Sequence, residues 1–549
     1  MRTGTARRGP GPATGPALST GAPDGAEPRA PLDGPDAGAG AAPPTGTSVS
    51  ARAGAIVVVV AFALSRLAVA AAGVRFDTGP LASGFQVLEL SELRDDLLGS
   101  LAHLHSQPPL FNLFLGLVLR VPQSWEEPLL RLVYLAAGLA TALAVFTVLV
   151  RFGVRSSVAV VLTLILALSP ATILFENWSH YDHLVVLLLC LSVLALARYE
   201  DGRRVRHVAL FLGLLAVLVL TRSTFQLVWF LAWAVALVLL RRRGEGRADW
   251  KRVAVAAGVP ALAIIAVYAN TLRVADSFTS STSLGVSLAK ITTFQLPEDA
   301  RREMVERGEL SPLALIPPFT PVPGYEEVLP PPPPTGVPVL DDEVKNFPDG
   351  STWINFNNLV YADVSRAYLD DALRTLRARP DAYLRGVAAG TEMFFRAPSD
   401  FFALRDNRAR LGSFDDWYNR LVQGVVASGE PVSVFPDVGR QYRQGPARTA
   451  WLGVVVYAVA LVGGAVVLWA GRRQRGGPGL LVLGFLWSTV AYVLVVSNLL
   501  EVGENERFRL YTDPLVLLLL AALALRWTGR RRATPAPTTS APSPLRRAT

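Results

Sequence analysis

The chain has 549 residues, of which 51% are hydrophobic and only 18% are charged, with a formal net charge of +9. Soluble domains typically hold about 25% charged residues, so the deficit of charge indicates a lipid environment. The excess positive charge does not indicate nucleic-acid binding, because the arginines gather in short tracts that end hydrophobic runs, such as 241–243 and 530–532. Composition therefore argues against a soluble domain and against a nucleic-acid partner.

The first 50 residues are rich in Ala, Gly, Pro, Ser and Thr and cannot bury enough apolar surface to offset the entropy of ordering. We predict a disordered cytoplasmic tail over 1–50 and another over 529–549. The single cysteine, Cys190, lies in an apolar run and cannot form an intrachain disulfide. Any segment outside the membrane must therefore be stable without a covalent cross-link.

Ten apolar runs approach the roughly 20 residues that a bilayer-spanning helix needs. A further apolar stretch, 108–121, is shorter and begins with two prolines, which suits an interfacial or re-entrant helix better than a span. The predicted fold class is an all-α polytopic membrane protein with about ten transmembrane helices. The predicted spans are 55–73, 129–150, 156–176, 182–199, 207–222, 224–240, 252–270, 449–470, 479–499 and 511–527.

The positive-inside rule decides the orientation of these spans. If 108–121 does not cross, the Arg-rich segments between spans fall on the same side as the N-terminus. Both termini are then cytoplasmic, and we expect a multi-pass protein of a bacterial plasma membrane. Four segments lie together on the outer face, namely 74–128, 176–182, 271–448 and 500–510.

The chain is thus predicted to divide into an N-terminal transmembrane core (51–270), an extracytoplasmic module (271–448) and C-terminal spans (449–528). The module contains a proline tract at 330–334 and a helical pattern of apolar residues over 368–383, so we expect it to be mainly helical. Aromatic residues near its end favour packing or membrane-surface contact over a sugar-binding platform. They are Phe394, Phe395, Phe401, Phe402, Trp417 and Tyr418.

Asp77 follows the first predicted span almost at once, so a rigid helix end would hold its carboxylate at the outer interface. A general base needs positioning of this kind. An isolated acidic residue outside a membrane helix is commonly only solvated, and it is the polar clusters predicted beside Asp77 that favour a functional role.

The stretch 176–183 is dense in titratable groups between two apolar runs, where unpaired charge is costly. We expect Asp182 and His183 to face a cavity. His180, Asp182 and His183 could instead bind a metal ion, with Asp77 as the obvious further ligand, but neighbouring positions rarely converge on one ion.

Three arginines, Arg222, Arg507 and Arg509, are predicted at the outer headgroup level. Guanidinium groups there suit phosphate recognition by paired hydrogen bonds. The alternative is snorkelling to lipid phosphates, which is as well supported for Arg222, whereas the polar run 504–509 favours a functional role for Arg507. Arg66, inside the first span, needs a partner that the sequence does not identify.

The order of these motifs resembles that of the GT-C superfamily of polyprenyl-phosphate-sugar-dependent glycosyltransferases, in particular the protein mannosyltransferase and lipid A aminoarabinose transferase branch. The matching features are an acidic residue after the first span (Asp77), a His-Ser-Gln-Pro-Pro-Leu segment (105–110), an Asp heading the fourth span (Asp182), and a Glu-x-x-Arg element before a late span (504–507). The likeness covers most of 54–527.

The resemblance implies a transfer of sugar from a polyprenyl-phosphate donor to a hydroxyl of a protein, glycan or lipid acceptor, with inversion at the anomeric carbon. Asp77 would be the catalytic base and Asp182 a second catalytic carboxylate, with no cofactor other than a possible divalent metal. The expected substrate-binding residues are His105, Gln107, His180, His183, Arg222, Glu504, Arg507 and Arg509.

Two other readings remain open. A transporter or lipid flippase for envelope precursors would favour two related halves with charged groups near the bilayer midplane, and the sequence shows no internal repeat. A non-catalytic envelope assembly protein would carry merely solvated carboxylates, and its function would survive replacement of Asp77 by Asn.

Overall fold

The computed structural model describes residues 50–243, 249–347, 349–433, 443–473 and 479–532. These residues belong to one compact unit that begins at Ser48. Of the two predicted tails, residues 1–49 and 533–549 lie outside the described part, whereas Ser50 and residues 529–532 belong to it.

All ten predicted spans coincide with helices of the described chain. Seven of these helices are long and apolar enough to cross a bilayer: α1 (Ala51–Ala71), α6 (Gln123–Arg151), α9 (Asp182–Gly202), α12 (Trp250–Ala275), α20 (Trp451–Arg473), α21 (Leu480–Leu500) and α22 (Asn505–Arg532). An eighth is counted if α7 (Ser156–Ala167) and α8 (Pro170–Glu176), bent by 59° at their junction, form one broken span.

The predicted count of about ten is therefore not confirmed. The remaining two helices, α10 (Val205–Thr221) and α11 (Leu227–Arg243), have 17 residues each and fall short of the usual length of a span, roughly 20 residues. The described residues do form the predicted class, an α-helical protein with several apolar helices long enough to span a membrane.

The surface of α20 shows why these helices require lipid. Val455, Val459 and Val462 on this helix are each more than half exposed, and tryptophans mark both of its ends at Trp451 and Trp469. Trp469 lies 18 positions after Trp451, a rise of about 27 Å, close to the roughly 30 Å of a bilayer's hydrocarbon layer. Tryptophan favours the two membrane interfaces, so this spacing is typical of a span.

The predicted outer loop 74–128 folds into four short helices, α2 (Gly79–Ser83), α3 (Leu90–Asp95), α4 (Leu97–Ala102) and α5 (Leu110–Val118). The nine residues of α5 rise about 14 Å, which is too short to cross a bilayer. The stretch 108–121 is thus no span, as predicted.

The segment predicted as an outer module is mainly helical and has its own core, which includes Tyr325 and Tyr368. The elements of the module are α13 (Leu284–Ile291), α14 (Glu298–Glu306), α15 (Pro338–Asp341), β1 (Val344–Asn346), β2 (Thr352–Ile354), α16 (Val360–Ala378), α17 (Pro380–Phe394), α18 (Arg405–Leu411), α19 (Ser413–Gln423), β3 (Val425–Ser433) and β4 (Arg443–Ala450), with several 3-10 turns. The helical pattern predicted over 368–383 falls on α16 and α17.

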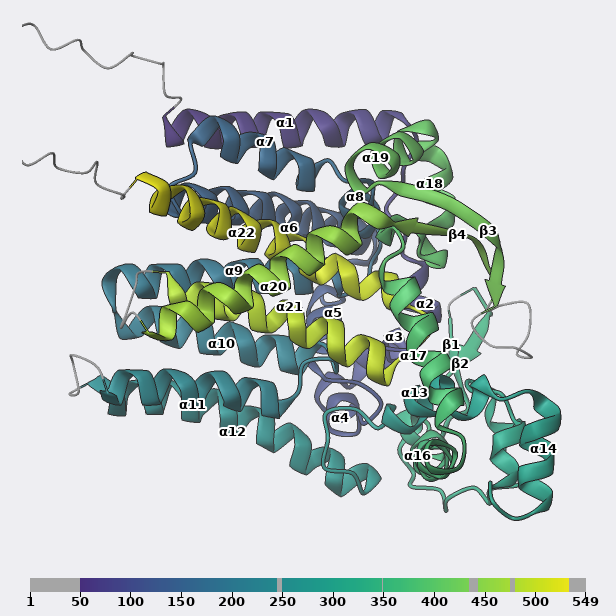
Figure 1. The fold of residues 1–549 in the computed structure, drawn as a ribbon. Helices are drawn as coiled ribbons and strands as arrows, with labels where there is room; N and C mark the ends of the chain where they lie inside the picture. The colour runs from purple at the N-terminus through teal and green to yellow at the C-terminus, as the bar shows by residue number, and fades with distance from the viewer. Residues whose placement is uncertain (1–49, 244–248, 348, 434–442, 474–478, 533–549) are drawn as a thin grey trace, which may run out of the picture. The chain divides into compact units, whose positions relative to one another are not determined.

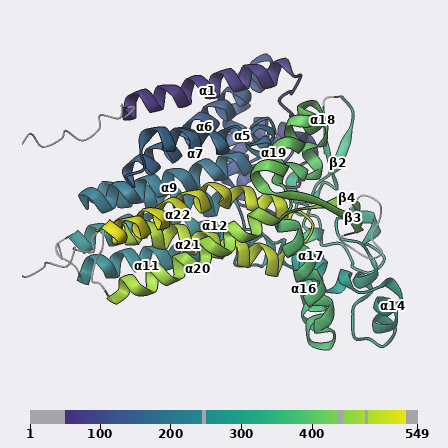
Figure 2. The same cartoon turned by 45° about the horizontal axis from the view of Figure 1, so that its top comes forward.

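Two antiparallel hairpins are the only sheets in the described residues. The strands β1 and β2 pair Lys345 with Trp353, and β3 and β4 pair Val425 with Ala450, where α20 begins. Within the unit, α1 begins and α22 ends at one end of the bundle, whereas the module and α2–α5 lie at the other (Figure 1; Figure 2). The predicted polar clusters lie at this module end.

Candidate active site

Asp77 is held against the stretch between α8 and α9 by two backbone hydrogen bonds. Its N–H donates to the carbonyl of Asn177 at 2.8 Å, and its carbonyl accepts from the N–H of Ser179 at 3.0 Å. This short bridge fixes the segment after α1 beside the titratable run 176–183. Residues about 100 positions apart in the sequence therefore meet at the module end, as the prediction required.

The carboxylate of Asp77 is half-buried, and one of its oxygens accepts from the N–H of Gly79 at 2.8 Å. Burial raises its pKa above the ordinary value, the Gly79 hydrogen bond lowers it, and the nearby Asp406 raises it further, with a net increase. A carboxylate with a raised pKa and an accessible face is a stronger base than a fully solvated one.

Asp182 begins α9 and is fully buried. One carboxylate oxygen accepts from Nδ1 of His180 at 2.5 Å, and the other accepts from the hydroxyl of Tyr511 and lies 3.5 Å from Nε of Arg507. Two hydrogen-bond donors and one guanidinium group at ion-pair distance therefore surround this carboxylate. Its geometry suits it to hold Arg507 and His180 in place, and leaves it less able than Asp77 to take a proton.

Arg507 is buried between two carboxylates and an aromatic ring. Its terminal nitrogen lies 2.7 Å from Glu504, and its guanidinium carbon lies 5.3 Å from the ring centre of Phe401. Burial opposes ionisation of Glu504, but Arg507 and Lys290 outweigh it and lower the pKa of Glu504. The pair is therefore ionised on both sides.

Arg222 ends α10 and is buried over the rings of Tyr181 and Phe508, at 5.0 Å from each centre. It donates to the hydroxyl of Tyr181, while its Nε has no hydrogen-bond partner in the described structure. Buried guanidinium N–H groups are normally bonded. A phosphate oxygen is able to accept a hydrogen bond from such an N–H group.

His180 connects these groups. Its ring stacks on Trp178 at 4.5 Å between centres, and its Nε2 lies 3.0 Å from Oε1 of Gln86 in the outer loop. Burial lowers the pKa of His180, although Asp182 raises it. Its backbone carbonyl accepts from Tyr134 at 2.8 Å.

His105 and Gln107 have a different environment from the one predicted. The Nδ1 of His105 lies 3.0 Å from the hydroxyl of Thr282, and its Nε2 lies 2.9 Å from the carbonyl of Asn357, so both ring nitrogens are used within the protein. Burial lowers the pKa of His105 to about 4, and the ring is neutral. His105 therefore joins the outer loop to the module, and Gln107, buried beside it, keeps an unpartnered Oε1.

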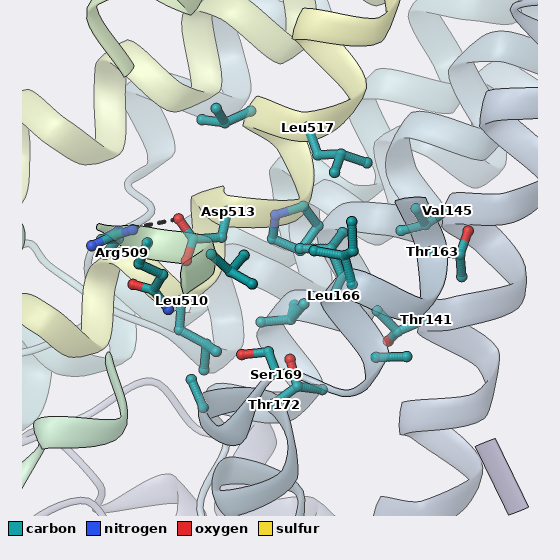
Figure 3. Close-up of a pocket in the computed structure, with 18 of the residues that line it drawn as sticks. Thr141, Val145, Thr163, Leu166, Ser169, Thr172, Arg509, Leu510, Asp513 and Leu517 are labelled. Carbon is teal, nitrogen blue, oxygen red and sulfur yellow. Dashed lines mark hydrogen bonds and ion pairs between the residues drawn. The ribbon is translucent and has the colours of Figure 1, made fainter. Parts of the chain in front are cut away.

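His183 and Arg509 line a cavity of about 260 Å³ that α9 helps to enclose. Arg509 lies 3.3 Å from Asp513 and donates to the carbonyl of Arg396 at 3.1 Å (Figure 3). The walls are mostly apolar and come from α6, α7, α8, α9, α19, α20 and α22. Three buried atoms of its lining residues have no hydrogen-bond partner within the described part of the chain, namely Thr163 Oγ1, His183 Nε2 and Gln423 Oε1.

The predicted site residues thus fall into three places. Asp182, His180, Arg222 and Arg507 are buried and form one cluster with the partly exposed Glu504, called the buried cluster below, with Asp77 joined to it through the backbone. His183 and Arg509 lie in the cavity, and His105 lies with Gln107 at the seam with the module. Asp77, Asp182, His105 and Arg507 do not line that cavity, so of Asp182 and His183, both expected to face a cavity, only His183 does.

The alternative of a metal site at 180–183 has no support in the described residues. Asp182 faces Tyr511 and Arg507, whereas His183 stacks on Tyr134 and lines the cavity, so the two side chains diverge. No group of three or more His, Cys, Asp or Glu residues in the described chain is arranged to hold a metal ion.

Three residues that contact the buried cluster were not predicted. Tyr511 stands four positions after Arg507 on α22, so helical spacing from the Glu-x-x-Arg element could have identified it. Tyr181 lies within the predicted stretch 176–183 but was not singled out. Gln86 comes from an irregular loop, where no sequence pattern indicates its contact with His180.

No protein-family model matches the chain, and no curated protein matches it either. The geometry of the buried cluster and of the cavity is therefore what bears on function.

Proposed function

We propose that this protein is an integral membrane glycosyltransferase that moves a sugar from a polyprenyl-phosphate donor to an acceptor hydroxyl on the extracytoplasmic face. The observation that supports it best is the buried cluster, in which Asp182 and Glu504 orient Arg507 beside Arg222, next to the half-buried Asp77. An apolar cavity in the membrane region lies beside this cluster. A polyprenyl-phosphate donor would need both environments, the arginines for its phosphate and the apolar cavity for its isoprenoid chain, and the acceptor hydroxyl would need the carboxylate of Asp77.

In the proposed reaction, the Asp77 carboxylate takes the proton of the acceptor hydroxyl, whose oxygen attacks the anomeric carbon. The bond from that carbon to the phosphate oxygen breaks, and polyprenyl phosphate leaves with both electrons of that bond. Attack opposite the leaving group inverts the anomeric carbon. The raised pKa of Asp77, caused first by burial, matches the task of a base.

Arg222 and Arg507 would stabilise the charge that develops on the leaving phosphate. Both guanidinium groups are buried, so their interaction with a phosphate is screened less than it would be in water. Asp182 and Glu504 would keep Arg507 in position before the donor arrives. The apolar cavity, with Arg509 among its lining residues, would take part of the donor's isoprenoid chain.

A lipid flippase is the second candidate, because the cavity carries unpartnered polar atoms such as Thr163 Oγ1 and His183 Nε2 between membrane helices. Such atoms suit a polar group that passes through the bilayer. A flippase would move the lipid without breaking the sugar–phosphate bond, so an assay of covalent transfer separates the two candidates.

The test uses purified full-length protein in liposomes with radiolabelled polyprenyl-phosphate sugars and a panel of hydroxyl acceptors. We expect Asp77→Asn to lower transfer by roughly 10²- to 10⁴-fold, the usual contribution of a general base. Asp406→Asn is the matched control, since it leaves the proposed base in place and removes only the smallest of the three influences on the pKa of Asp77, so it should lower transfer far less than Asp77→Asn. Undiminished transfer by Asp77→Asn would overturn the assignment, and lipid movement without transfer by the unmodified protein would favour the flippase.

A further inference from the structure

The helix α19 carries three large apolar side chains that the protein leaves exposed. Phe414, Trp417 and Leu421 are 36%, 59% and 65% exposed. Their spacing of three and four residues places them in one stripe along the helix. An apolar stripe of this size on a short helix is costly in water and is typical of a contact surface.

The opposite face of α19 is fixed to the protein, so the stripe cannot turn inward. Asp415 accepts from the hydroxyl of Ser399 at 2.6 Å and from Nδ2 of Asn419 at 2.8 Å. The hydroxyl of Tyr418 donates to the carbonyl of Ile165 in α7 at 2.5 Å. α19 is therefore held at the module end of a membrane helix, with its apolar stripe outward.

The stripe continues onto the lipid-facing surface of α20. Gly424, which ends α19, lies against Leu452, and both Leu452 and its neighbour Trp451 are exposed. Trp451 is also the module-end tryptophan of α20, so the stripe lies beside the predicted headgroup level. Exposed Arg420 on the same helix is suited to lipid phosphates at that level.

The same helix bounds the cavity. Tyr418, Val422 and Gln423 line it, which places α19 at the cavity's module end, beside α8 (Figure 1). The exposed stripe and the cavity wall are thus two sides of one helix of 11 residues.

We propose that α19 is an interfacial helix that inserts Phe414, Trp417 and Leu421 into the module-side leaflet of the phospholipid bilayer and forms the lip of the cavity at that leaflet. The occupant of the exposed stripe is the bilayer itself, because the stripe continues the lipid-facing surface of α20. The proposal holds whether or not the protein is a transferase.

The experiment measures how deeply Trp417 enters the bilayer. Cys190 is the sole cysteine, so Cys190→Ala provides a cysteine-free background. Trp417→Cys is labelled with an environment-sensitive fluorophore in the full-length protein, reconstituted in phosphatidylcholine vesicles. Trp353→Cys is the matched control, because Trp353 is a similarly exposed tryptophan on the β1–β2 hairpin of the module. Gel filtration checks that both variants fold.

We expect spin-labelled (doxyl) lipids to quench the label at 417 at least threefold more than the label at 353, and aqueous iodide to show the reverse order. Leu421→Cys should behave like Trp417→Cys, which keeps the test valid if one variant expresses poorly. Equal quenching at 417 and 353 by either quencher would overturn the proposal, because α19 would then contact water or another protein surface.

Discussion

At the scale of single residues, Lys345 shows how the module is fixed to the outer loop. Its ammonium group is buried and donates to the carbonyls of Gly84 and Val87, both at 3.0 Å. Burial lowers its pKa to about 8, although Glu89 opposes this shift. Lys345 therefore makes two hydrogen bonds of normal length to the outer loop, and its charge state changes near pH 8.

Replacing Lys345 with Met tests this contact. Between pH 8 and 10.5 the unfolded chain keeps a proton that the folded protein has released, so the free energy of unfolding of the unmodified protein rises with pH in this window. Relative to Lys345→Met, the rise should reach about 3 kcal/mol. Chemical denaturation in detergent at pH 7.5, 9 and 10.5 measures it, and parallel pH profiles for the two proteins would contradict the assignment.

At the scale of elements, an ion pair inside the membrane region spans the bend between α7 and α8. Arg66 of α1 lies 2.8 and 2.7 Å from the two oxygens of Glu176 and donates to the carbonyl of Ala167, where α7 ends. The buried arginine thus has the carboxylate and carbonyl partners that its position in a span requires. The bend in turn shapes the wall of the cavity.

Gly138 on α6 leaves room for this ion pair. A Cβ atom there would lie 2.1 Å from Oε2 of Glu176, so Gly138→Ala should displace the pair and lower the free energy of unfolding by about 1–3 kcal/mol. Gly213→Ala on α10 is the control, because a Cβ there meets nothing within 4 Å and should stabilise the helix by about 0.5–1 kcal/mol. Thermal unfolding of both variants measures the difference. Equal effects would show that Glu176 can move without cost.

At the scale of the whole molecule, the ends of the described chain lie at one end of the bundle and the module at the other (Figure 1). The arginine tracts predict that the module faces outward. Trp353→Cys in the module and Thr528→Cys near the end of α22, each in the Cys190→Ala background, test this orientation with a membrane-impermeant maleimide. We expect labelling of residue 353 in intact cells and of residue 528 only after permeabilisation, and the reverse order would invert the topology.

Hydrophobic length predicted the position of every membrane helix, because a span needs little more than a run of apolar residues. It did not predict the break in 156–176, although α8 begins at Pro170, a residue that interrupts a helix. The contacts of Arg66 with Ala167 and Glu176 at this break are remote in sequence. The buried cluster followed from charges at the ends of apolar runs, as with Asp182 and Arg507.

The assignment of His105 to substrate shows the limit of a motif. The sequence shows a histidine before Pro108-Pro109, but the partners of its two ring nitrogens come from Thr282 and Asn357 in the module, more than 170 residues away. A motif indicates which residue is unusual, whereas the folded chain decides whether its polar atoms remain available. Gln86 illustrates the converse, since its contact with His180 has no local signature.

Because lysine is scarce, the folded protein exposes few lysine amino groups. The sequence has only three lysines, of which Lys290 and Lys345 are buried, whereas Lys251 is exposed at the start of α12. The start of α12 lies at the end of the bundle away from the module (Figure 1). Amine-directed cross-linkers and biotinylation reagents therefore find one lysine side chain on the folded protein, and surface immobilisation through it leaves the module and the candidate site facing the solution.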